Sequence, residues 1–183
     1  MEEANQQEQY LKLLLTGASG TGKTSSIIYG APKPLLVFDL EQGAGQYSKV
    51  ANFTVFQNSK IAGFDPTNPD NILWFTEQLL QAQAQGHKLP FKSILLDSGT
   101  VLYNRIMNDY LKELRNNGEP NKKKLEPNEY AFPKNKFYDI IRNLKRLNVN
   151  LFITTHASDN YLKTAFMKVD PQEPVKPDCE KRL

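Results

Sequence analysis

Short apolar runs, separated by polar and glycine-rich stretches, dominate the pattern along the chain. The runs are four to seven residues long and do not alternate between apolar and polar positions. Such runs are typical of strands buried on both faces of a parallel sheet. Five strands are expected, over residues 12–16, 35–39, 53–56, 93–97 and 149–155.

Between these runs, apolar residues recur at the spacing of a helix face. Three helices are expected, on Ile72, Phe75, Leu79 and Leu80, on Leu102, Ile106, Leu111 and Leu114, and on Phe137, Ile140, Ile141, Leu144 and Leu147. Another should follow the first strand and end near Gly30, because Pro32 and Pro34 come next. Strands that alternate with helices predict an α/β fold whose mostly parallel central sheet has helices on both faces.

The 183 residues, 39% of them hydrophobic, fit one globular domain over residues 11–183, after a polar tail over residues 1–10. Residues 116–133 lack periodicity and are rich in Asn, Pro and Lys, which predicts a mobile basic surface loop. No apolar run approaches the roughly 20 residues that a bilayer crossing needs. The single cysteine, Cys179, allows neither an internal disulfide nor a thiolate zinc cluster. We expect a soluble protein of the reducing cytoplasm.

The glycine-rich stretch after the first strand matches GxxxxGK[ST] in full and precedes an expected helix. Its glycines let successive N–H groups point at phosphate oxygens, and the helix N-terminus adds positive potential. The alternative is a glycine-rich turn that merely contains a lysine. The expected nucleotide-binding residues are Gly17, Ala18, Ser19, Gly20, Thr21, Gly22, Lys23, Thr24 and Ser25.

This motif predicts that ATP and Mg²⁺ bind here, with Lys23 reaching the β and γ phosphates and the Thr24 hydroxyl on the metal. Asp97 ends the fourth apolar run, where a Walker-B aspartate would orient the metal shell. A strand-end aspartate could instead cap the following helix.

Two further residues are candidates for catalysis. Ser98, not Glu, follows Asp97, which argues against ATPases that place the catalytic Glu there. Glu41 lies just past the second strand, on the ligand side of a parallel sheet, where it could polarise the attacking water. His156 ends the last run and could sense the γ phosphate, although a lone His is often structural.

Together these elements resemble the RecA-like ATPase family, which includes recombinases, hexameric helicases and small bacteriophage proteins linked to single-strand annealing. The resemblance covers residues 11–158 and rests on the phosphate loop, Phe38 to Glu41, Leu95 to Ser98 and Phe152 to His156. It implies a homo-oligomeric ring or filament in which a neighbour's Lys or Arg completes the ATP site. Lys163 and Lys168 are candidates for that role. Further strands of the family would be expected after His156, so a chain that ends at Leu183 is either a minimal member or an incomplete one.

Basic charge is concentrated in residues 112–146, which hold ten Lys or Arg and five Asp or Glu, interleaved with aromatic residues. Such a surface could hold single-stranded DNA through phosphate contacts and base stacking, or could be only a solvated face. The resemblance favours DNA. The expected contacts are Lys122, Lys123, Lys124, Lys134 and Lys136.

The leading hypothesis is thus a DNA-stimulated ATPase of recombination, annealing or replication, located in the host cytoplasm if the chain is of phage origin. One alternative is a P-loop kinase in which Asp39 or Glu41 holds the acceptor, with Arg115, Arg142 and Arg146 in a lid. Another is a nucleotide-gated scaffold that binds but barely hydrolyses ATP.

Overall fold

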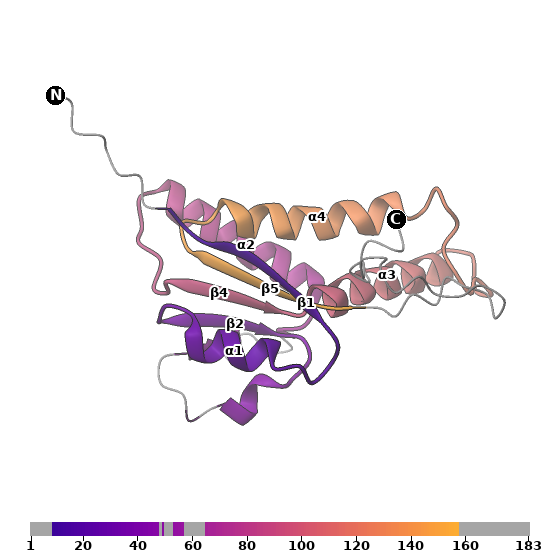
Figure 1. Cartoon of the computed structure of the whole chain (residues 1–183). Helices are drawn as coiled ribbons and strands as arrows, with labels where there is room; N and C mark the ends of the chain where they lie inside the picture. The colour runs from indigo at the N-terminus through magenta and orange to yellow at the C-terminus, as the bar shows by residue number, and fades with distance from the viewer. Residues whose placement is uncertain (1–8, 48, 50–52, 57–64, 158–183) are drawn as a thin grey trace.

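A computed structural model describes residues 9–47, 49, 53–56 and 65–157 of the chain (Figure 1). Five strands form one sheet in the order β1-β5-β4-β2-β3, and every neighbouring pair is parallel. The strands are β1 (Lys12–Gly17), β2 (Leu35–Asp39), β3 (Phe53–Val55), β4 (Ser93–Asp97) and β5 (Asn150–His156). Each expected strand is therefore present, with its ends within one residue of the prediction.

Helices cover both faces of this sheet (Figure 1). They are α1 (Lys23–Gly30), α2 (Pro69–Ala84), α3 (Gly99–Asn116) and α4 (Ala131–Arg146), with a short 3-10 helix, η1 (Ala44–Tyr47). The α1 helix lies on one face, and α2 and α4 lie on the other. The α/β fold expected from the sequence, with a parallel sheet flanked on both faces, is confirmed.

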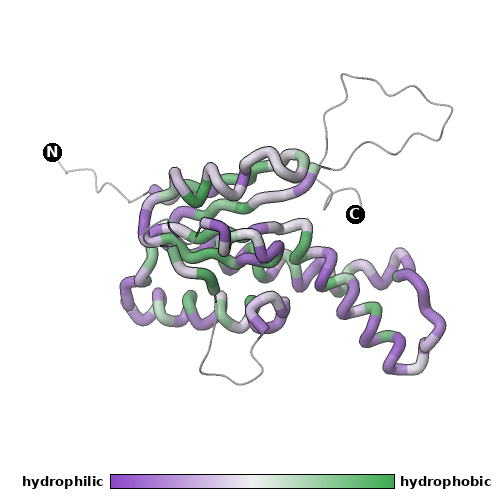
Figure 2. The backbone as a smooth tube through the Cα atoms, turned by 90° about the horizontal axis from the view of Figure 1, so that it is seen from below, coloured by the Kyte–Doolittle hydropathy of each residue, from purple (hydrophilic) through white to green (hydrophobic). Residues whose placement is uncertain are grey.

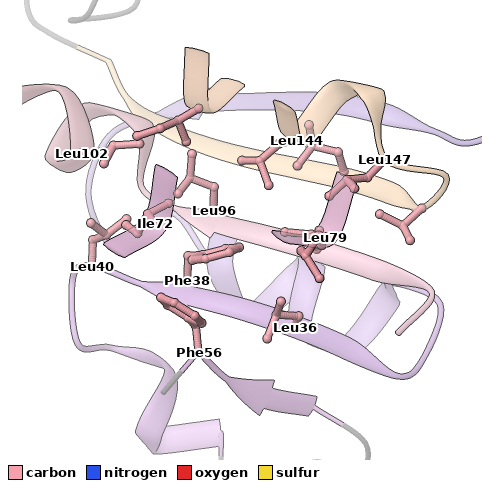
Figure 3. Packing of buried hydrophobic residues seen from close by; sticks show 14 of the residues in the cluster. Leu36, Phe38, Leu40, Phe56, Ile72, Leu79, Leu96, Leu102, Leu144 and Leu147 are labelled. Atoms are coloured by element: carbon pink, nitrogen blue, oxygen red, sulfur yellow. The ribbon is translucent and has the colours of Figure 1, made fainter. Parts of the chain in front are cut away.

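Alternate residues of the central strands supply two separate cores. In β2, Leu36 and Phe38 join the larger core beneath α2, α3 and α4 (Figure 3), while Leu35 and Val37 join the smaller core beneath α1. Burial on both faces removes any advantage of polar residues in the strands, which explains their unbroken apolar runs.

Local sequence signals begin two of the helices. Asn68 accepts a hydrogen bond from the backbone N–H of Asp70 (2.8 Å), and Pro69 occupies the first position of α2. Ser98 Oγ accepts from the N–H of Val101 (3.3 Å) at the start of α3. The cap of α3 is therefore Ser98, and the carboxylate of Asp97 remains available for other contacts.

The second half of α3 and the segment after it extend beyond the carboxyl-terminal edge of the sheet (Figures 1 and 2). We call residues 110–136 the basic arm. Leu111 and Leu114 are only half-buried there, because no sheet lies beneath them. Within the described ranges, no helix has both the length and the apolar character that a bilayer crossing requires.

The expected loop over residues 116–133 is shorter in the structure. Asn116 ends α3, and α4 already begins at Ala131, so Pro133 lies inside its first turn. Proline is tolerated there because the first N–H groups of a helix have no partner within it. The connection over residues 117–130 contains side-chain hydrogen bonds and the buried Leu125. Its mobility stays a prediction.

Candidate nucleotide-binding and catalytic site

The phosphate loop joins β1 to α1 at the carboxyl-terminal edge of the sheet. Gly20 and Gly22 have φ values of 76° and 81°, a left-handed conformation that glycine adopts without strain. The first turn of α1 contains no acidic residue, so nothing there offsets the positive potential of the helix N-terminus. The loop therefore has the backbone conformation and the electrostatics of an anion site.

The side chain of Lys23 lies over this loop. Its Nζ donates to the carbonyl oxygens of Gly17 (2.9 Å) and Ala18 (2.8 Å). These are neutral acceptors, so the ammonium charge is held in place without being neutralised. A phosphate group beside the loop would meet a cation that is already positioned.

Thr24 and Asp97 lie together, as the sequence predicts for the metal side of the site. Thr24 Oγ1 donates to Asp97 Oδ2 at 2.8 Å, and Thr154 on β5 donates to the other oxygen, Oδ1. Both hydroxyls stabilise the ionised carboxylate, but burial is the larger effect, and it raises the pKa of Asp97 above 3.8. The nearby Glu41 and Asp39 carboxylates add to this rise.

Glu41 and His156 also meet at this edge. His156 Nε2 lies 2.7 Å from Glu41 Oε1, and because an ionised carboxylate only accepts, the imidazole nitrogen donates. The strand order explains the contact: β5 lies between β1 and β4, so its last residues reach the phosphate loop and Asp97 together. The backbone N–H of His156 donates to Thr100 Oγ1 at 3.0 Å.

Glu41, Asp97 and His156 line one pocket of about 330 Å³, together with residues of the phosphate loop from Ser19 to Ser25. The pocket also includes Gly43, Gln46 and Tyr47 of the segment around η1, which sequence reasoning did not select. Their proximity to Glu41 in the chain, just past a strand end, is the signal that could have identified them. A larger hollow, about 730 Å³, lies at the opposite edge near His87 and Lys92, away from the phosphate loop.

The residues present fit a magnesium ion that arrives with nucleotide. Thr24 and Asp97 offer hydroxyl and carboxylate oxygens, the hard ligands that Mg²⁺ prefers. The part of the chain that the structure describes contains no cluster of three or more His, Cys, Asp or Glu that could hold a metal unaided. In sites of this kind, Mg²⁺ is usually bound through one or two protein oxygens and the substrate phosphates.

The lysines predicted to contact nucleic acid are not equivalent. Lys122 is largely buried, and its Nζ contacts Glu119 and Glu129 at 2.6 Å each, which raises the pKa of Lys122. Lys136 pairs with Asp70 at 2.6 Å. Lys123 and Lys124 are exposed, and Lys134 lies 5.6 Å from the ring centre of Tyr138. Lys122 is thus already neutralised by its neighbours.

Lys163 and Lys168, the candidates for completing a neighbour's site, lie outside the described residues.

Comparison with known proteins identifies the family of the chain. The model of the AAA domain family, AAA_24, matches residues 9–181, so the chain belongs to that family. With the phosphate loop described above, this makes the chain a P-loop ATPase domain that binds nucleotide, typically with Mg²⁺.

More distant matches add little. No curated protein matches the chain. Among solved structures, it is similar to the pCW3 conjugation coupling protein TcpA, in its monomer form with ATPγS, at 14% identity and a TM-score of 0.40. That match covers 82% of this chain but only 44% of TcpA, so the chain spans less than half of that protein's length.

Proposed function

We propose that this domain is a RecA-like ATPase that hydrolyses ATP to ADP and phosphate, with Glu41 as the general base. The observation that carries the proposal is the position of the Glu41 carboxylate. It lies in the same pocket as Lys23, Thr24 and Asp97, and 2.7 Å from His156. A carboxylate beside a phosphate and metal site is the group that hydrolysis needs to take a proton from water.

In this proposal each side chain has a separate task. The loop N–H groups and Lys23 bind the phosphates and stabilise the charge that develops during transfer. Mg²⁺ supplies further charge neutralisation on the phosphate oxygens. The Thr24 hydroxyl keeps donating to Asp97 while its oxygen lone pairs remain free for the metal.

Glu41 accepts a proton from the attacking water, whose oxygen bonds to the γ phosphorus as the bond to the β–γ bridging oxygen breaks. His156, which donates to the same carboxylate, orients Glu41. The contact between His156 and Glu41 joins β5 to the turn after β2. Through it, release of the γ phosphate would be linked to a movement of β5 or of that turn, and this link is the sensor role proposed for His156.

We further propose that single-stranded DNA is the partner that stimulates this ATPase, in recombination, annealing or replication. The exposed Lys123 and Lys124 support this, as do the aromatic rings of the basic arm. Tyr110 and Phe132 stack with ring centres 4.9 Å apart, and Phe132 is 59% exposed. Exposed rings beside lysines suit base stacking together with phosphate contacts. Assembly into a ring or filament stays a proposal that rests on the resemblance.

The kinase alternative has less support, because its lid arginines are dispersed. Arg115 Nε donates to the backbone oxygen of Lys122 at 2.6 Å, and Arg142 pairs with Asp139 at 3.0 Å. Arg146 ends α4, near the start of β5 and thus at the far edge of the sheet from the phosphate loop. The scaffold alternative differs from the proposed ATPase only in whether Glu41 activates water, so that bound ATP is hydrolysed.

Steady-state ATP hydrolysis with Mg²⁺, with and without single-stranded DNA, at low and raised salt, tests the proposal, with Lys23→Ala as the blank. We expect single-stranded DNA to increase the rate of ATP hydrolysis, and raised salt to reduce this stimulation. Lys23→Ala should not hydrolyse ATP under either condition. Turnover indifferent to DNA would remove the nucleic-acid part. Phosphorylation of a small acceptor would favour a kinase, and binding without turnover would favour a scaffold.

A further inference from the structure

Glu41 belongs to a turn whose two ends are anchored in different cores. Leu40, 3% exposed, packs into the core beneath α2, α3 and α4, and Ala44, fully buried, packs into the core beneath α1. The turn between them crosses the carboxyl-terminal edge of the sheet at Gln42, whose φ of 57° is in the left-handed region. We call residues 39–44 the Glu41 turn.

The carboxylate of Asp39 closes this turn from the inside. Its Oδ1 accepts the N–H of Gly43 at 3.0 Å, and its Oδ2 accepts the N–H of Ala44 at 2.9 Å. On the other side, the Asp97 carbonyl accepts the N–H groups of Leu40 (2.7 Å) and Glu41 (3.3 Å). Four backbone N–H groups of the turn are therefore held by only two aspartates.

We propose that Asp39 is a positioning residue for catalysis, which fixes the backbone of the Glu41 turn so that Glu41 reaches its water. The inference rests on the proposed function, because it assumes that Glu41 is the general base. Asp39 is not itself the base in this account, since both of its oxygens already accept backbone N–H groups. Its contribution acts through geometry, and small displacements of a reacting group are costly.

Asp39→Asn separates this role from nucleotide binding. An amide has one acceptor oxygen, so its NH₂ group must face the N–H of Gly43 or Ala44, and one of the two hydrogen bonds is lost. We expect kcat to fall about tenfold, since a misplacement near 1 Å can cost up to a hundredfold. KM and the affinity for Mg·ATP should stay within about threefold, because Lys23, Thr24 and Asp97 are unchanged.

Two further variants serve as controls. Asp39→Glu keeps the negative charge near Asp97 but moves the oxygens, so it should lose kcat as Asp39→Asn does. Asp65→Asn removes a carboxylate that, like Asp39, stabilises a local turn through hydrogen bonds. Asp65 accepts hydrogen bonds from the backbone N–H (2.8 Å) and the hydroxyl (2.7 Å) of Thr67. Asp65 does not line the nucleotide pocket, and this variant should leave kcat unchanged. Thermal unfolding of each variant checks that it folds.

A double-mutant cycle with Glu41→Gln then decides the matter, with single-turnover rates measured for all four proteins. If Asp39 acts through Glu41, Asp39→Asn lowers the rate of the parent protein but not that of Glu41→Gln. Equal losses in both backgrounds, or wild-type kcat in Asp39→Asn or Asp39→Glu, would overturn the positioning role while leaving the proposed function intact. If Glu41→Gln keeps full activity, the proposed base and this inference both fall.

Discussion

Asp39 and Asp97 stand directly opposite one another, as register partners at the ends of the parallel strands β2 and β4. The same alignment places Gly17 opposite His156 on β1 and β5. The strands β1, β2, β4 and β5 therefore end at one edge, where Asp97 and His156, the last residues of β4 and β5, line the nucleotide pocket with residues that follow β1 and β2. The site is a consequence of parallel register, because all strands present their carboxyl ends to the same side.

The first prediction concerns the pH dependence of stability in the metal-free protein. Burial raises the pKa of Asp97 in the folded state above its ordinary value of 3.8, so the folded protein holds this proton more tightly than the unfolded chain does. The contribution of Asp97 to stability therefore falls as pH rises from about 3.8, and the loss is complete once the pH is above the folded pKa.

Asp97→Asn removes that titration and keeps a polar group beside Thr24 and Thr154. We expect the variant to gain stability relative to the parent as pH rises through this window, and to lose most of the stabilisation that Mg·ATP gives the parent. Denaturant unfolding across the pH series with a chelator, then with Mg·ATP, measures both effects. A stability difference that does not change with pH would contradict the burial argument.

Thr154 provides the second prediction, since its hydroxyl donates to Asp97 Oδ1. In Thr154→Val that donor is lost, the pKa of Asp97 should rise further, and the carboxylate should hold the metal shell less well. The Mg²⁺ concentration needed for half-maximal stabilisation by ATP should increase about tenfold, as expected for a lost hydrogen bond to a charged group. Thr154→Ser keeps the hydroxyl and should resemble the parent. An unchanged Mg²⁺ requirement in the valine variant would exclude this role.

The third prediction addresses the basic arm. Lys123 and Lys124 are exposed, so the double alanine variant should weaken single-stranded DNA binding and reduce the slope of log K against log salt by about 1.4, for two phosphate contacts. Lys122→Ala should leave the slope unchanged, because Glu119 and Glu129 already compensate that charge.

Fluorescence anisotropy of labelled single-stranded DNA over a salt series measures these slopes. A double alanine variant of Lys88 and Lys92, which line the hollow at the opposite edge, is the matched charge control. An equal loss in that control would assign the binding to net charge and not to the arm.

Much of this arrangement could be predicted from local sequence. The apolar runs located all five strands, because burial on both faces leaves an unbroken apolar signal. The phosphate loop and Asp97 followed from a motif and a strand end. Ser98 rather than Asp97 caps α3, which settles the alternative role of that aspartate in the described structure.

What the sequence does not contain is the order of strands across the sheet. The contact of His156 with Glu41 depends on β5 lying between β1 and β4, and no local pattern encodes that order. Thr154 was missed for the same reason, since its partner lies 57 residues away in the chain. The lysine run did not reveal that Lys122 is paired. Its partner Glu129 lies seven residues further along the chain, and only the folded conformation of residues 117–130 brings the two side chains together.

The most direct test of the account is the kcat of Glu41→Gln, measured beside its affinity for Mg·ATP. Glutamine has nearly the same shape, can still contact His156 and cannot accept the proton, so we predict a fall in kcat of about 10²-fold to 10⁴-fold. Affinity for Mg·ATP should be retained, because the phosphate loop and Asp97 are unchanged. Wild-type turnover in this variant would contradict the account and remove Glu41 from the mechanism.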